Sequence, residues 1–108
     1  MATYKTLGQA APAANVFTDL YTTPAATQTV MSTLAVCNRA TASCTYRVAV
    51  RVGGAALNAA HYLVYDASLP GNQTTTLTIG IAMAATDVLT VSASSPNVTF
   101  AGFGVENP

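Results

Sequence analysis

The sequence predicts an all-β protein, a single antiparallel β-sandwich of about seven to eight strands with an Ig-like or jelly-roll topology. Turn-forming Pro, Gly, Asn, Asp and Ser residues recur at short intervals, and the runs between them are rich in Val, Thr, Tyr, Leu and Ile. Several runs alternate apolar and polar residues with the two-residue period of a strand that has one buried face. The 108 residues have the size of one domain, so we expect a single domain over 1–108.

The turn signals place the strands. We expect them at 3–8, 15–22, 28–37, 45–52, 61–66, 73–81, 88–94 and 98–105. The alanine-rich segment 53–62 is expected to hold at most one helical turn, because it is short and begins with glycines. The predicted core includes Leu34, Val36, Leu63, Leu89, Val91 and Phe100, and the tyrosines are expected to pack inside the sandwich.

Two runs alternate most clearly. Within 45–52, one face carries Tyr46, Val48, Val50 and Val52, and the other carries Arg47, Ala49 and Arg51. Within 73–81, one face carries Thr74, Thr76 and Thr78, and the other carries Thr75, Leu77, Ile79 and Ile81. In each run we expect the apolar set to face the core and the other set to face outward.

The two cysteines flank a short polar turn between 28–37 and 45–52, which we expect to pair as a hairpin. The register that gathers all apolar side chains on one face puts Cys37 and Cys44 on opposite faces. We therefore expect no Cys37–Cys44 disulfide, in keeping with a reducing compartment. A bridge between nearby thiols is the alternative.

The N-terminal stretch 1–14 is a possible extended arm. Its strand-like residues, including Tyr4, Lys5 and Leu7, are separated from the rest by the run "AAPAA". Such an arm can add a strand to a neighbouring subunit. Pairing within its own chain is the favoured alternative.

Composition argues against most kinds of chemistry. Only 7% of residues are charged, 51% are hydrophobic and the net charge is zero, so we expect neither nucleic acid nor a membrane as a partner. A chain with so little charge is expected to hide surface in a homo-oligomer or larger assembly. No leader segment is recognisable, and we expect a soluble protein made in a cytosol.

No constellation of residues suggests a catalytic or cofactor site. His61 is the one histidine, and its spacing from the cysteines does not fit a metal site. Asp66 and Asp87 are typical of turn residues that bond the local backbone. We therefore expect no enzyme, no catalytic residue, no metal and no cofactor.

Nearly the whole chain resembles a family of short virion structural proteins of tailed bacteriophages. The resemblance runs through "YKTLGQAAPAA" (4–14), "TDLYTTPAATQTVMSTLAVCNR" (18–39), "YRVAVRVGGAALNAAHYLVYD" (46–66), "LTIGIAMAATDVLTVSAS" (77–94) and "VTFAGFGVENP" (98–108). It implies a small β-sandwich that assembles onto phage heads or tails after synthesis in the host cytoplasm. It carries no enzymatic motif.

The resemblance leads us to expect a capsid decoration, or cement, protein that binds the major capsid protein lattice as a homo-oligomer, possibly a trimer. The alternative is a tail, fibre or baseplate component that binds tail proteins. A carbohydrate-binding module is a third hypothesis, which needs an exposed aromatic platform and is weakened by the absence of Trp. An enzyme is the fourth.

The expected interface residues come from three segments. They are Arg47 and Arg51, Tyr4, Lys5 and Leu7 on the possible arm, and Thr74, Thr76 and Thr78 on the threonine face. The two arginines either deter edge pairing on a solvated strand or contact an acidic partner. The sequence leaves both interpretations open.

Overall fold

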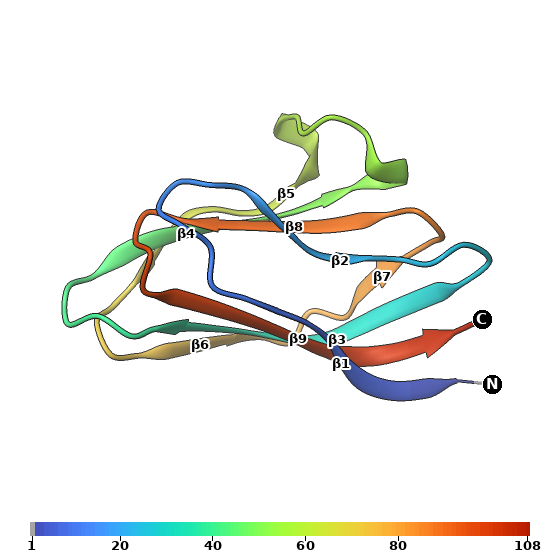
Figure 1. The fold of residues 1–108 in the computed structure, drawn as a ribbon, viewed down its shortest axis with the longest axis horizontal. Helices are drawn as coiled ribbons and strands as arrows, with labels where there is room; N and C mark the ends of the chain where they lie inside the picture. Colours follow the sequence, from blue (N-terminus) through green and yellow to red (C-terminus); the bar gives the residue numbers. More distant parts are fainter. Residues whose placement is uncertain (1) are drawn as a thin grey trace.

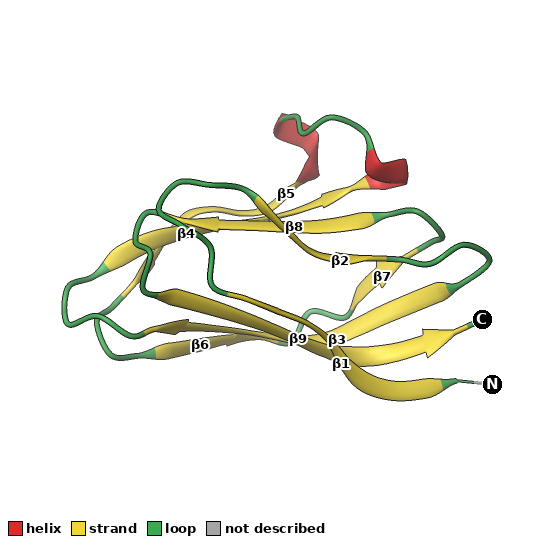
Figure 2. Cartoon of the chain, viewed as in Figure 1, coloured by secondary structure: helices red, strands yellow, loops and turns green. Residues whose placement is uncertain are grey.

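Two antiparallel β-sheets stack face to face in the computed structural model, which describes residues 2–108 (Figures 1 and 2). The first sheet has the order β1-β9-β3-β6, and β7 also pairs with β3. The second has the order β2-β8-β4-β5. The strands of the first sheet are β1 (Thr3–Ala10), β9 (Val98–Asn107), β3 (Gln28–Asn38), β6 (Thr74–Leu77) and β7 (Ile81–Met83). Those of the second are β2 (Thr18–Thr22), β8 (Val88–Ala93), β4 (Cys44–Arg51) and β5 (Tyr62–Leu69).

The strand order identifies a jelly roll. When β6 and β7 are counted as one interrupted strand, the sheets read 1-8-3-6 and 2-7-4-5, which is the double Greek key of that topology. The predicted all-β sandwich is confirmed, and the order selects the jelly roll over the Ig-like alternative. The interruption falls at residues 78–80, where Gly80 has a φ of +61°. Ile79 there is exposed, so its predicted inward position is wrong.

The core between the sheets follows the predicted alternation in most strands. Its largest fully buried side chains include Phe100, Met31, Leu34, Leu69, Leu89, Val36, Val48 and Val91. Leu63 is 46% exposed, so its predicted core position is wrong. The reason is local: between Val64 and Tyr62, β5 has one residue more than β4, and Leu63 is the extra residue that has no partner there.

Other predictions of side-chain direction also fail locally. Val52 is exposed because β4 ends one residue earlier and the chain enters a single 3₁₀ turn, η1 (Val52–Gly54). A second turn, η2 (Ala59–His61), follows, so the segment holds two short turns where at most one was expected. Ala49 is fully buried on the outer side of β4. Of the tyrosines, Tyr21 and Tyr46 are buried as predicted, whereas Tyr4 and Tyr65 are exposed.

The predicted hairpin between 28–37 and 45–52 is wrong. These segments become β3 and β4, which belong to different sheets. Cys37 lies opposite Thr99 and Thr74 in the first sheet, and Cys44 lies opposite Leu69 in the second. Both thiols are free, and burial raises the pKa of Cys44. The cysteines are therefore divided between two sheets, and not between two faces of one hairpin.

The N-terminal stretch pairs within its own chain. β1 runs antiparallel to β9, from Thr3 opposite Glu106 to Ala10 opposite Phe100. A bulge between Thr6 and Gly8 turns Leu7 into the core. The strand thus forms one edge of the first sheet in its own chain.

A polar cluster joins the two sheets near the end of β9. The Tyr21 hydroxyl of β2 donates to the Glu106 carboxylate of β9 and lies 2.9 Å from the Thr29 hydroxyl of β3. Lys5 Nζ lies 3.0 Å from the other Glu106 oxygen. The hydrogen bond from Tyr21 and the contact with Lys5 lower the pKa of Glu106, and burial together with Glu106 raises the pKa of Tyr21 to about 12.

Replacing Glu106 should therefore cost stability in a pH-dependent way. Because the folded-state pKa is lowered, the ionised carboxylate stabilises the fold above its unfolded-state pKa, and this contribution disappears as the pH falls through the folded-state value. Chemical unfolding of wild type and E106Q should show a larger difference at pH 7 than at pH 3. A difference that stays constant over this range would contradict the assignment.

Two inward-facing glycines of β9 make room for β3. A Cβ at Gly102 would lie 2.5 Å from the flexible end of Met31, and a Cβ at Gly104 would lie 2.0 Å from the backbone oxygen of Val30. We expect G104A to lower the free energy of unfolding by about 3 kcal/mol or more, and G102A by about 1 kcal/mol, because a methionine can shift and a paired backbone cannot. Urea unfolding of the two variants checks this order, and equal losses would refute it.

Candidate functional site

The outer surface of the first sheet carries no charged side chain on its strands. We call it the uncharged face, and the pairing register defines it in rows across the sheet. The first row is apolar: Tyr4 lies opposite Val105, Val105 opposite Val30, and Val30 opposite Ala82. Tyr4 is 83% exposed, and Val30 is exposed in the middle of the sheet.

The remaining rows of the uncharged face become more polar toward the far end. They consist of Thr6, Phe103 and Thr33; then Gln9, Ala101, Ala35 and Thr76; then Thr99, Cys37 and Thr74. The two charged residues of these strands, Lys5 and Glu106, take the alternate positions and contact each other. The face therefore offers apolar and hydroxyl groups without ions.

An ion-free sheet surface suits protein–protein contact. The centre of a protein interface is depleted in charged residues, because burying an ion requires its desolvation. Threonine hydroxyls can donate or accept across such a contact. The arrangement can bind another protein surface, and its polar side chains include the Tyr4 phenol, threonine hydroxyls and the partly buried Cys37 thiol.

The predicted interface residues divide between opposite sides of the sandwich. Tyr4, Thr74 and Thr76 lie on the uncharged face, Tyr4 at one edge and the threonines at the other. Thr78 is exposed just beyond the end of β6. The remaining four are placed elsewhere: Leu7 is buried in the core, Lys5 is paired with Glu106, and Arg47 and Arg51 lie on the second sheet.

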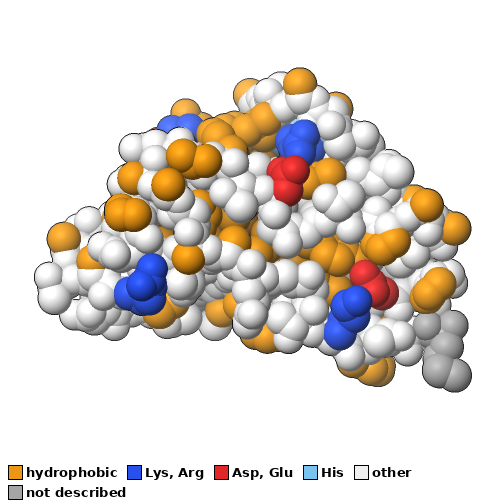
Figure 3. All heavy atoms as spheres, viewed as in Figure 1, with side chains coloured by type: hydrophobic (Ala, Val, Ile, Leu, Met, Phe, Trp, Pro, Cys, Tyr) orange, Lys and Arg blue, Asp and Glu red, His pale blue; other side chains and the backbone are white. Residues whose placement is uncertain are grey.

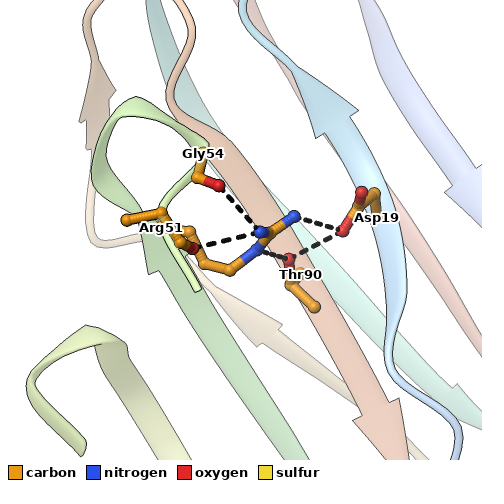
Figure 4. Close-up of polar contacts among 5 residues, drawn as sticks. Asp19, Arg51, Gly54 and Thr90 are labelled. Carbon is orange, nitrogen blue, oxygen red and sulfur yellow. Dashed lines mark hydrogen bonds and ion pairs between the residues drawn. The ribbon is translucent and has the colours of Figure 1, made fainter. Parts of the chain in front are cut away.

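Arg51 connects three strands and a turn on the outer side of the second sheet (Figure 4). Its Nε donates to the Thr90 hydroxyl and its Nη2 to Asp19, both at 3.0 Å. Its Nη1 donates to the carbonyls of Gly54 and Ala55 at 3.1 Å. Thr90 in turn donates to Asp19. The guanidinium is thus committed to holding the loop after β4 against β2 and β8.

Arg47 forms a two-bond ion pair with Asp66 of β5. Its Nε and Nη2 donate to the two carboxylate oxygens at 2.6 and 3.0 Å, and its guanidinium lies 4.2 Å from the centre of the Tyr65 ring. The hydrogen bonding raises the pKa of Arg47 and lowers that of Asp66. Asp66 is therefore not the turn residue that the sequence suggested, although its φ of +53° marks a local distortion of the strand.

The other charges are satisfied within the chain as well. Asp87 accepts backbone hydrogen bonds from Gly53 at 2.8 Å and Ala84 at 3.0 Å, which bears out its predicted turn role. Arg39 reaches the Pro96 carbonyl at 3.4 Å. Figure 3 shows charged side chains in isolated spots on a largely uncharged surface, some of them as a basic and an acidic side chain next to each other.

Sequence reasoning missed three apolar members of the uncharged face, the exposed Val30 and Phe103 and the partly exposed Val105. A signal was present in "VTFAGFGVEN", where the odd-numbered positions 99–105 alternate with small or buried residues. The large Phe103 on the outside and the glycines on the inside invert the usual pattern. The inverted pattern can be interpreted only when β9 is known to pair with β3, because the inward glycines then leave room for Met31.

Comparisons of the chain with known protein families, curated proteins and solved structures find no match. No helical segment within residues 2–108 has the length and hydropathy needed to cross a bilayer. In the same range, no three His, Cys, Asp or Glu side chains converge in a way that could hold a metal ion.

The two arginines should differ in their effect on stability. R51A is expected to lower the free energy of unfolding by about 1–3 kcal/mol, because it leaves Asp19, Thr90 and two carbonyls without their donor. R47A removes an exposed pair and should cost less. Thermal and urea unfolding compare the variants, and a larger loss for R47A would contradict this division of roles.

Proposed function

We propose that the protein is a non-enzymatic structural component of a bacteriophage virion, a capsid decoration protein that binds the major capsid protein lattice through its uncharged face. The single observation that carries the docking surface is the ion-free outer side of the first sheet, with its exposed apolar row. The phage setting rests on the resemblance of nearly the whole sequence to small virion proteins.

The distribution of charge supports a role in assembly. Three ion pairs join Lys5 to Glu106, Arg47 to Asp66, and Arg51 to Asp19. The paired charges stabilise the fold, and they contribute little electrostatic potential at the protein surface. Copies with zero net charge can gather at high density without mutual repulsion. The jelly-roll topology also occurs in viral capsid proteins, which is a fold analogy.

A decoration protein acts through repetition. Each copy adds modest contacts across a seam between capsid subunits, and a homo-oligomer, for which we propose a trimer, engages several seams at once. The linked contacts bind more tightly than any one of them and resist outward pressure on the shell. A position on the tail, fibre or baseplate would use the same face with far fewer copies.

The proposal predicts a high copy number and a specific dependence on the uncharged face. Quantitative mass spectrometry of purified virions should find this chain in amounts comparable with the major capsid protein. Virions grown with V30E or T76E in place of wild type should lose most of the protein, because a buried unpaired carboxylate opposes docking. Both positions are exposed in the isolated chain, so the variants should fold with unchanged melting temperature.

A56E is the matched control. Ala56 is exposed in the loop between η1 and η2, which projects from the second sheet, away from the uncharged face (Figure 1). This variant should be incorporated like wild type. A few copies per particle would replace the head assignment by the tail assignment. Absence from the particle would refute both, and normal incorporation of V30E and T76E would refute the docking surface.

A further inference from the structure

A groove opens on the other side of the sandwich, beside β5 and the projecting loop. It is lined by Leu57, Asn58, Ala59, Tyr62 and Tyr65, measures about 480 Å³ and is widely open to solvent. A groove of this shape holds one face of a ligand and leaves the other in water.

Two bulges in β5 create the wall of the groove. β5 has one residue more than β4 between Ala67 and Val64, and again between Val64 and Tyr62. Bulges redirect side chains and are common next to binding sites. Here they leave Tyr65 61% exposed, with its ring held outside the core.

The aromatic side chains form a connected and supported set. Tyr62 and Tyr65 meet nearly at right angles, at 86°, with ring centres 4.9 Å apart. Phe17 lies 6.5 Å from Tyr62 on the side of β2. The Arg47 guanidinium lies over one face of the Tyr65 ring, 4.2 Å from its centre, and is itself anchored to Asp66. The groove is thus held in place before any ligand arrives, which lowers the entropic cost of binding.

The electrostatics of the groove select the class of ligand. Arg47 and Asp66 cancel each other through two hydrogen bonds, so a charged ligand would have to break that pair to gain a partner of its own. The Asn58 Oδ1 accepts from the Ala60 amide at 2.9 Å, which leaves the side-chain NH₂ free to donate. A ligand with an apolar face, hydroxyl groups at its edge and no charge matches these features.

We infer that this groove binds a neutral saccharide, with the apolar face of a sugar ring against the face of the Tyr65 ring that Arg47 leaves open and hydroxyl groups within reach of Asn58. It supplies the exposed aromatic platform that a carbohydrate-binding module requires, built from tyrosines in place of tryptophan. A nucleic acid would need a basic channel for its backbone, whereas Arg47, which borders the groove through its contact with Tyr65, is paired with Asp66. The site lies on the second sheet and does not depend on the function proposed for the uncharged face.

Saturation-transfer NMR on the full chain tests this inference with cellotetraose, chitotetraose, maltotetraose and an oligothymidylate as probes. Wild type should transfer saturation to the ring protons of at least one saccharide at millimolar concentration. Y65F keeps the ring and should retain binding, whereas Y65A should bind roughly tenfold more weakly, which corresponds to about 1.4 kcal/mol of lost stacking. Y4A is the matched control, because Tyr4 is an exposed tyrosine on the opposite sheet.

Amide shift mapping on wild type provides a second readout that needs no variant. The saccharide that binds should shift the amides of Asn58, Tyr62 and Tyr65 and leave those of the uncharged face unchanged. The inference is overturned if none of the saccharides binds, if Y65A binds as well as wild type, or if the shifts map elsewhere. Binding that depends on Tyr65 but occurs only with the oligothymidylate would also overturn it.

Discussion

The pairing of β3 with β9 in the middle of the first sheet is the constraint on which the rest of the structure depends. It extends from Gln28 opposite Asn107 to Asn38 opposite Val98. Gly102 and Gly104 face inward there, and their missing side chains leave the space that Met31 and the β3 backbone occupy. Because side chains alternate along a strand, the same register turns Phe103 and Val105 outward. The register of β9 against β3 therefore produces both the close approach of the two strands on the inner side and the apolar residues of the uncharged face on the outer side.

The scarcity of charge has a structural use as well as a functional one. With four basic and four acidic residues, the chain can form few ion pairs, and the three found among residues 2–108 each join two different strands. Lys5 and Glu106 act with Tyr21 where the two sheets meet, whereas Arg51 and Arg47 fasten the second sheet and its loop. The first sheet is left with an outer surface that costs little to desolvate. The two sides of the sandwich are consequently suited to different contacts.

The second sheet shows how a jelly roll can carry a ligand site at an edge. β5 pairs only with β4, and its bulges interrupt the ladder of backbone hydrogen bonds that an edge strand presents. The same bulges lift Tyr65 out of the strand and bring Asp66 to Arg47. Protection of the edge and exposure of an aromatic surface are thus two consequences of one distortion. The positive φ of Asp66 is tolerable because aspartate adopts this conformation more readily than most residues and is held here by the arginine.

The sequence by itself determined the β class, the approximate strands and most of the core, because alternation and turn residues act over short distances. Leu34, Val36, Leu89, Val91 and Phe100 are buried for that reason. The sequence could not predict which strands pair, because the apolar pattern of 28–37 fits β4 as well as β9. Only the tertiary structure places β3 and β4 in separate sheets. The sequence predicts part of the uncharged face, namely Tyr4, Thr74 and Thr76. That these residues share one face with Val30 and Phe103 follows only from the pairing register of the first sheet. The roles of Arg47 and Arg51 likewise depend on partners 19 and 32 residues away, and no local pattern encodes such a distance.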